Sequence, residues 1–269
     1  RMILRRIAHR VMLERGLLPD FSEDVIAEVN ALREPVVADD RSVRDLREFL
    51  PALLCAVETS PANTPDAGAW LAWSKERRRR YPVPSDRTPA LRDGFINPYF
   101  FLAALFHRLR ADDVVVCANG SANVIAYQCA VIQKGQRMFC NTGDASMGYG
   151  LPASIGAAVG GGRRVICLEG DGSIMMNLQE LQTVSLHRWP IKIVVLDNRG
   201  YVSIRQSQRN FFDRLTGEGP GSGVTFPDFR AVASAMGLPA RTISGGAFEA
   251  ELTEFLAEPG PAVAQVLLD

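Results

Sequence analysis

The sequence predicts an α/β fold, in which a parallel sheet carries helices on both faces and is preceded by a helical partial domain. From Asn97 onward, short apolar runs alternate with helical segments, and this alternation is typical of a parallel sheet that is covered on both sides. Two of the apolar runs end in polar loops, Gly170-Asp171-Gly172 and Asp197-Asn198. Open α/β sheets bind ligands at the carboxyl ends of their strands, so both loops lie where a site is expected.

The charge-rich start of the chain is expected to be mostly helical. Apolar residues recur at helical spacing from Asp45 to Val57, which predicts a helix there. A second helix is predicted from Trp70 to Arg80, and it ends in four consecutive arginines. We interpret these arginines as a solvated helix face, with a phosphate-binding patch as the alternative. Tyr81-Pro82-Val83-Pro84 breaks any helix, so we expect a linker near residues 76–93.

The elements of the sheet domain follow in order. Its first helix is expected to start at Asn97-Pro98, with Asn as the cap and Pro at the first helical position, and to run from Tyr99 to Arg110. The predicted strands are Val114 to Cys117, Arg164 to Glu169, Ile191 to Leu196 and Val263 to Leu268. The further predicted helices are Leu151 to Val159, Ser173 to His187, Asp228 to Met236 and Ala247 to Leu256.

Composition excludes several function classes. The 269 residues contain 30 acidic and 30 basic side chains, so no net charge is available to attract nucleic acid or a membrane surface. No apolar run reaches the roughly 18 residues of a membrane span. The cysteines form no Cys-x-x-Cys pair, which argues against a zinc site or an iron–sulfur cluster. Their odd number and apolar surroundings indicate reduced thiols, and we expect a cytoplasmic protein.

The two polar loops offer the groups that a magnesium diphosphate needs. Asp171 and Asn198 supply a carboxylate and an amide oxygen, which suit Mg²⁺. Gly170 and Gly172 let the backbone approach an anion, and Ser173 is expected to open a helix whose free amides favour phosphate oxygens. A helix cap and a turn former are the alternative for such residues. Two loops separated by 24 residues, each after an apolar strand, favour the ligand site.

Together the two loops resemble the cofactor signature of thiamine-diphosphate-dependent enzymes, in which the second loop more often reads Asn-Asn. The closer resemblance is to acetolactate synthases and related enzymes that decarboxylate 2-oxoacids. It rests on three blocks in the same order: Thr142 to Pro152, Gly170 to Leu181, and the segment from Asp197. The resemblance covers about residues 95–269. It implies that residues 83–269 are the diphosphate-binding domain and residues 1–82 the tail of the family's middle domain with a linker.

The resemblance assigns roles in binding thiamine diphosphate. It implies that Asp171, Asn198 and the backbone carbonyl of Gly200 bind Mg²⁺, and the metal then holds the diphosphate. Asn119-Gly120-Ser121-Ala122-Asn123 follows a predicted strand at the position of another diphosphate loop in the family, and Asn119, Gly120 and Ser121 are the cofactor residues expected there. Acetolactate synthases carry Gly-Gln-His-Gln there, so only the location is carried over, and a plain glycine turn is the alternative.

The resemblance also implies contacts with the rings of the cofactor. Met147 would wedge beneath the cofactor and force the cofactor into a bent shape. This shape gives the amino group of the cofactor a large effective molarity at the reacting carbon of the cofactor. The alternative for Met147 is a gap-filling core residue. The carbonyl of Ala145 would accept a hydrogen bond from the same amino group. Tyr201 is assigned to the cofactor site, and the segment from Tyr201 to Phe212 should cover its mouth. Glycines at 217, 219, 221 and 223 suggest a mobile lid.

The implied reaction is decarboxylation of a 2-oxoacid, with pyruvate as the expected substrate, and transfer of the acyl unit to a second carbonyl compound. A simple decarboxylase that releases an aldehyde and a non-catalytic cofactor-binding homologue are the alternatives. Ser207 occupies the position of a tryptophan that favours a larger second 2-oxoacid in acetohydroxyacid synthases, and we expect a bulkier or more polar acceptor.

The resemblance implies a partner as well. The family's cofactor-activating glutamate lies in a pyrimidine-binding domain that we do not find in this sequence. No catalytic residue is therefore assigned here, and activity is expected to require a homodimer, a higher oligomer or a separate chain with that domain. The sequence leaves open whether FAD is bound and whether the chain is complete, truncated or a split subunit.

Overall fold

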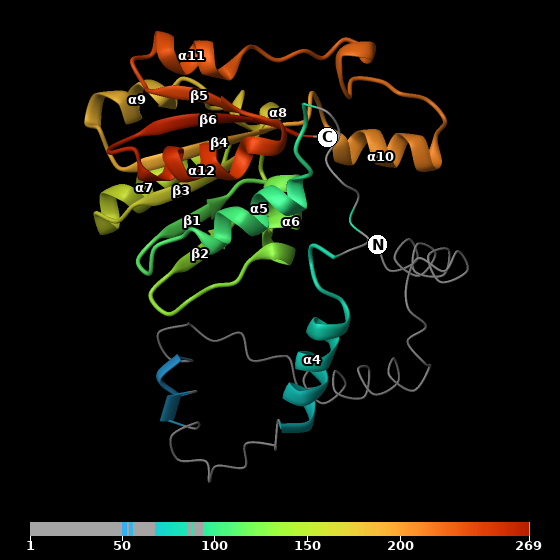
Figure 1. Ribbon diagram of the computed structural model, residues 1–269, viewed down its shortest axis with the longest axis vertical. Coiled ribbons are helices and arrows are strands. Elements are labelled where there is room, and N and C mark those ends of the chain that lie inside the picture. The colour runs from blue at the N-terminus through green and yellow to red at the C-terminus, as the bar shows by residue number, and fades with distance from the viewer. Residues whose placement is uncertain (1–49, 53, 56–67, 86–87, 89–93, 269) are drawn as a thin grey trace. The chain divides into compact units, whose positions relative to one another are not determined.

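The computed structural model describes residues 50–52, 54–55, 68–85, 88 and 94–268 (Figure 1). The chain divides into two compact units, residues 1–71 and 72–269. In the first unit, residues 50–52 and 54–55 are helical, and the rest of the predicted helix from Asp45 to Val57 lies outside the described residues. The predicted partial domain and the boundary after residue 82 stay predictions. Helix α4, Gly68–Arg80, confirms the predicted helix that ends in four arginines.

The second unit contains a sheet of six strands, all of them parallel to their neighbours. Its strand order is β2-β1-β3-β4-β6-β5. The strands are β1 Val114–Cys117, β2 Arg137–Cys140, β3 Val165–Gly170, β4 Ile191–Asp197, β5 Ala240–Ile243 and β6 Ala262–Leu267. Gly170 of β3 pairs with Leu196 of β4. The two polar loops therefore leave adjacent strands at the same edge of the sheet.

Helices cover both faces of this sheet, as predicted (Figure 1). One hydrophobic core joins the sheet to α5, α6 and α12, and a second core joins the other face to α7, α9 and α11. The helices are α5 Pro98–His107, α6 Ser121–Cys129, α7 Gly150–Gly161, α8 Asp171–Ile174, α9 Glu180–His187, α10 Val202–Phe211, α11 Phe229–Ala235 and α12 Phe248–Ala257. Short 3-10 helices run over Pro220–Ser222 and Gly245–Ala247. Within the described parts of the chain, no helix is long and apolar enough to cross a bilayer.

Alternation along β4 shows why its sequence is apolar from Ile193 to Leu196. Ile193 and Val195 point into one core, and Val194 and Leu196 point into the other. A strand that is buried on both faces has no polar positions to mark its period. The predicted cap of α5 is confirmed as well, because Asn97 Oδ1 accepts a hydrogen bond from the Tyr99 amide at 2.9 Å.

Several elements differ from the expectation. Strands β2 and β5 were not predicted, and both lie at the edges of the sheet with mixed or exposed side chains. Helices α6 and α10 were also missed. The predicted helix from Ser173 to His187 is wrong, because the chain forms α8, a turn and then α9. In that turn Asn177 Nδ2 donates a hydrogen bond to the Gly148 carbonyl at 2.8 Å, a tertiary contact that a helical pattern does not reveal.

Candidate functional site

The structure brings all twelve residues that the sequence assigned to cofactor or metal around one cavity of about 240 Å³ at the carboxyl edge of the sheet. They are Asn119, Gly120, Ser121, Ala145, Met147, Gly170, Asp171, Gly172, Ser173, Asn198, Gly200 and Tyr201. Four further lining residues were not predicted: Leu196, Val202, Ser203 and Ile204. The last three come from the start of α10, which was expected to cover the mouth but was not recognised as a helix. The individual roles assigned to the twelve residues stay predictions.

A larger hollow of about 700 Å³ lies between α5 and α12. Its lining is mainly apolar, and its two oppositely charged side chains, Arg108 and Glu249, pair with each other at 2.7 Å. It offers neither an unpaired carboxylate nor a glycine-rich loop to a ligand. The smaller cavity therefore remains the better candidate for chemistry.

Asp171 joins the two loops that follow β3 and β4. Its side chain is buried, with Oδ1 accepting a hydrogen bond from the Gly172 amide at 2.7 Å and Oδ2 accepting one from the Gly200 amide at 2.9 Å. Burial raises the pKa of Asp171 to about 6, the two amides lower it, and the charge of Asp197 raises it further. A buried carboxylate of this kind is stabilised in its charged form by a nearby cation.

Asn198 carries an unsatisfied group. Its Oδ1 atom is buried, and no hydrogen-bond partner for it occurs among the described residues. Buried polar atoms almost always have a partner, so an orphan of this kind indicates an absent ligand, ion or water. An amide oxygen beside a buried carboxylate fits a hard divalent cation such as Mg²⁺. The described residues contain no group of three His, Cys, Asp or Glu side chains that could hold a metal, so a backbone carbonyl or a ligand would have to complete the shell.

Asp197 is oriented differently from its neighbour. Its Oδ2 accepts a hydrogen bond from Gln265 Nε2 at 2.7 Å, and its Oδ1 accepts one from the Arg199 amide at 3.0 Å. Asp197 lines a separate hollow with Gln265, while Asn198 lines the cavity. Successive residues at a strand end point to opposite sides. Asp197 therefore shapes the loop, and Asn198 faces the candidate site.

The Gly-Asp-Gly loop differs from the expectation in two respects. Helix α8 begins at Asp171 and has only four residues, so Ser173 does not open the long helix that was predicted. The Ser173 hydroxyl accepts a hydrogen bond from the Gly148 amide at 2.9 Å. At Gly172, an added Cβ would overlap the ring of Tyr201. This glycine therefore admits the Tyr201 ring into the cavity wall, where the ring meets Phe226 edge-on with centroids 5.8 Å apart.

The segment with Ala145 and Met147 is held from two sides. The Ala145 carbonyl accepts a hydrogen bond from Asn119 Nδ2 at 3.1 Å, and Ala145 itself has a positive φ of 52°. Such a backbone conformation is uncommon outside glycine and often marks a functional site. Met147 is 37% exposed and lines the cavity, so it is not a buried core residue.

Glu169 is a buried carboxylate that the sequence reasoning missed. Its Oε1 accepts a hydrogen bond from the Leu151 amide at 2.9 Å. Burial raises the pKa of Glu169 to about 7, and hydrogen bonds from Ser173 and from the amides of Leu151 and Gly150 oppose this rise. A single acidic residue in the otherwise apolar run from Val165 to Gly170 was the available signal.

Ser207 does not line the cavity. It is exposed on α10, one turn beyond the lining residue Ser203. Residues four apart on a helix lie on the same side, so a larger side chain at 207 would extend over the mouth. The predicted mobility of the glycine-rich segment after α10 stays a prediction.

The sequence of this chain is similar to those of known proteins. The family model described as thiamine pyrophosphate enzyme, C-terminal TPP binding domain, matches residues 118–266. The chain is 35% identical over 246 residues to the acetolactate synthase isozyme 2 large subunit of Escherichia coli (strain K12), an alignment that covers 90% of this chain and 42% of that protein. It is 29% identical over 251 residues to the isozyme 1 large subunit of the same organism, with 90% and 41% covered. The acetolactate synthase large subunit of Pyropia yezoensis is 32% identical over 249 residues, with 90% and 39% covered. The chain thus spans less than half the length of these relatives.

Proposed function

Since the chain belongs to the family of thiamine pyrophosphate enzymes, we propose that it serves an acetolactate synthase-like reaction, in which a 2-oxoacid is decarboxylated and its acyl unit is transferred to a second carbonyl compound. Pyruvate is the proposed first substrate. The observation that carries the proposal is the single cavity lined by every residue assigned to the cofactor, with the orphaned Asn198 oxygen in its wall. The names of the curated relatives, acetolactate synthase large subunits, support the choice of reaction.

The proposed division of labour follows from the lining of the cavity. Asp171, Asn198 and the Gly200 carbonyl would hold Mg²⁺. The glycine loop of β3 and the segment Asn119-Gly120-Ser121 would bind the diphosphate, while Ala145, Met147 and Tyr201 would contact the rings. When bound, thiamine diphosphate supplies the carbanion chemistry. The chain would orient it, balance its charge through the metal and exclude water from it.

The proposal includes an assembly. A cofactor-activating glutamate would come from a pyrimidine-binding domain in a partner subunit, either in a homodimer or in a separate chain. The relatives are named as large subunits, which supports an assembly of more than one kind of chain.

Product analysis tests the reaction. The purified protein, with any chain that co-purifies, would be incubated with thiamine diphosphate, Mg²⁺, ¹³C-labelled pyruvate and a panel of carbonyl acceptors, and the products would be read by NMR. A new carbon–carbon bond is expected. Free aldehyde would instead identify a simple decarboxylase. Cofactor binding without carbon dioxide release would identify a non-catalytic homologue.

Acceptor choice has its own test at Ser207. A tryptophan in place of Ser207 would extend over the mouth from the exposed face of α10, and we expect it to shift the acceptor preference toward a larger 2-oxoacid and away from other carbonyl acceptors. Competition between two acceptors measures this ratio directly. Equal turnover of Ser207→Trp with all acceptors would refute the role of this position.

A further inference from the structure

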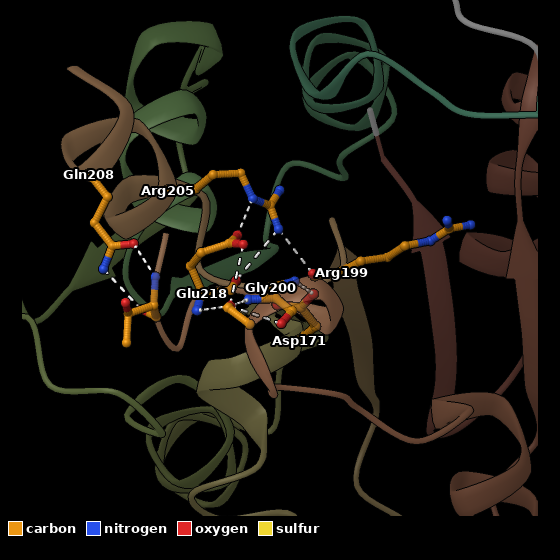
Figure 2. A network of polar contacts seen from close by, with 9 residues as sticks. Asp171, Arg199, Gly200, Arg205, Gln208 and Glu218 are labelled. Carbon is orange, nitrogen blue, oxygen red and sulfur yellow. Dashed lines mark hydrogen bonds and ion pairs between the residues drawn. The ribbon is translucent and has the colours of Figure 1, made fainter. Parts of the chain in front are cut away.

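The loop that contains Gly200, one of the residues that line the cavity, contacts Glu218, as Figure 2 shows. The Gly200 amide is bound by Asp171, and the next amide, that of Tyr201, donates to the Glu218 carbonyl at 2.8 Å. Gly200 has a φ of 144°, and an added Cβ would overlap the Glu218 carbonyl oxygen. The position of this loop is therefore set by residue 218, which lies in the segment between α10 and α11.

One guanidinium group fastens both sides of this contact. Arg205 on α10 forms an ion pair through Nε with the carboxylate of Glu218, and its Nη2 donates to the Arg199 carbonyl at 3.1 Å (Figure 2). A planar guanidinium can hold two acceptors in fixed directions, which a lysine ammonium cannot do equally well. At Gly219 an added Cβ would lie 2.7 Å from Arg205 Nη2, so the glycine leaves room for the side chain.

We propose that Arg205 and Glu218 are positioning residues for the metal: their ion pair fixes the backbone from Arg199 to Tyr201, and thereby the Gly200 carbonyl and the Asp171 carboxylate. The inference rests on the proposed thiamine diphosphate and Mg²⁺ site. The Glu218 side chain is 6% exposed, and neither Glu218 nor Arg205 lines the cavity. Both residues act through the loop and touch no reacting atom.

The same helix offers a matched control. Gln208, three residues after Arg205, holds the segment between α10 and α11 through two hydrogen bonds with Thr216: its Nε2 donates to the carbonyl at 2.9 Å, and its Oε1 accepts from the amide at 2.8 Å. These contacts lie in the same network but do not involve residues 199–201 (Figure 2). Gln208→Leu therefore loosens the segment without releasing the loop.

Two measurements on the purified full protein, in the assembly that it forms, test the inference. The first is the Mg²⁺ dissociation constant at saturating thiamine diphosphate, followed by calorimetry. Groups that orient metal ligands change metal affinity by about 10–100-fold, so Arg205→Met is expected to raise this constant by at least tenfold. Arg205→Lys keeps a cation beside Glu218 but loses the fork to Arg199, and an intermediate rise is expected. Gln208→Leu is expected to stay within twofold of the parent protein.

The second measurement is hydrogen exchange of the Gly200 and Tyr201 amides without metal or cofactor. Faster exchange is expected in both Arg205 variants and unchanged exchange in Gln208→Leu. The inference would be overturned if the Arg205 variants kept the Mg²⁺ affinity of the parent protein, or if Gln208→Leu lost as much Mg²⁺ affinity as they do. Unchanged amide exchange at residues 200 and 201 in the Arg205 variants would overturn it as well. A parent protein that binds no Mg²⁺ and thiamine diphosphate would instead overturn the proposed function, and the exchange data would still decide the positioning role. If Arg205→Met does not fold, Arg205→Lys supplies the same comparison.

Discussion

Buried polar groups are paired differently at the two edges formed by the amino and carboxyl ends of the strands in the central sheet. At the amino edge, Arg164 pairs with the fully buried Asp113 through two nitrogens, at 2.8 and 2.5 Å, and donates a third hydrogen bond to the Leu256 carbonyl at 2.7 Å. Lys192 of β4 is also buried, and its ammonium donates to the Glu258 carbonyl at 2.6 Å, at the end of α12. Each of these charged groups finds its partner within the chain.

At the carboxyl edge the polar groups remain open. Asn198 Oδ1 has no partner among the described residues, and the pKa of the buried Asp171 is raised. Two residues other than glycine, Ala145 and Arg199, adopt positive φ in the loops of this edge. Strained backbone and unpaired polar atoms cost stability and persist where function requires them. The contrast separates charges that hold the fold from groups that wait for a ligand.

The largest effect is expected at the amino edge, which we call the closed edge because its buried charges are paired within the chain. Asp113→Ala removes the partner of Arg164 and leaves a mostly buried guanidinium unpaired, so the free energy of unfolding should fall by about 3–5 kcal/mol. The Arg110 amide, which donates to Asp113 Oδ2 at 2.7 Å, loses its acceptor as well. Urea unfolding followed by circular dichroism measures the change.

Arg164→Met combined with Asp113→Ala is the control for this prediction. The double variant removes both charges, so it should be more stable than the sum of the two single losses implies. A loss below about 1 kcal/mol in Asp113→Ala would show that this edge is not held by its ion pair, and the contrast between the edges would fail.

The opposite result is expected at the open edge. Asn198→Leu keeps the branched shape of the side chain and removes the orphaned oxygen, so the free energy of unfolding should stay equal or rise by about 1 kcal/mol. Under the proposed function the same variant should bind Mg²⁺ with thiamine diphosphate at least tenfold more weakly, which corresponds to about 1.4 kcal/mol. Unfolding and calorimetry on the same preparation separate the two effects.

Asn210→Leu, at an exposed position of α10, serves as the matched control and should change both quantities little. A strong loss of stability in Asn198→Leu would instead mean that the Asn198 oxygen has a hydrogen-bond partner within the protein. The polar groups of the carboxyl edge would then be paired, like those of the amino edge.

The burial of the strands also explains what the sequence could predict. Central strands β1, β3, β4 and β6 are buried along almost their whole length, so their residues form mainly apolar runs that are easily recognised. Edge strands β2 and β5 have one neighbour each and carry exposed side chains, which leaves no such signal. The parallel fold was therefore predictable, while its width was not.

The site divides in the same way. Asp171 and Asn198 follow recognisable strands, and their loops could be placed at one edge of the sheet from the sequence. Arg205 and Glu218 meet across a turn whose path is set by tertiary contacts, and neither residue stands out by type or spacing. Sequence reasoning locates groups at strand ends, but it does not locate the contacts that hold those groups in place.

The last expected effect concerns Lys192 and depends on pH. Burial lowers the pKa of Lys192 to about 8 from an ordinary 10.5, an effect that nearby arginines strengthen and Glu258 opposes. Between about pH 8 and 10.5 the folded chain therefore binds fewer protons at this lysine than the unfolded chain, so the free energy of unfolding should rise with pH. The full shift would give about 1.4 kcal/mol per pH unit; because solvent screens charges at the edge of the sheet, we expect about 1–2 kcal/mol in total. Lys192→Met removes this contribution, so the stability difference between the parent protein and the variant should grow in favour of the parent from pH 7.5 to 10.

Urea titrations at several pH values measure this difference in stability. A difference that is constant across this range would mean that Lys192 keeps its ordinary pKa and that the charge at the closed edge is not desolvated.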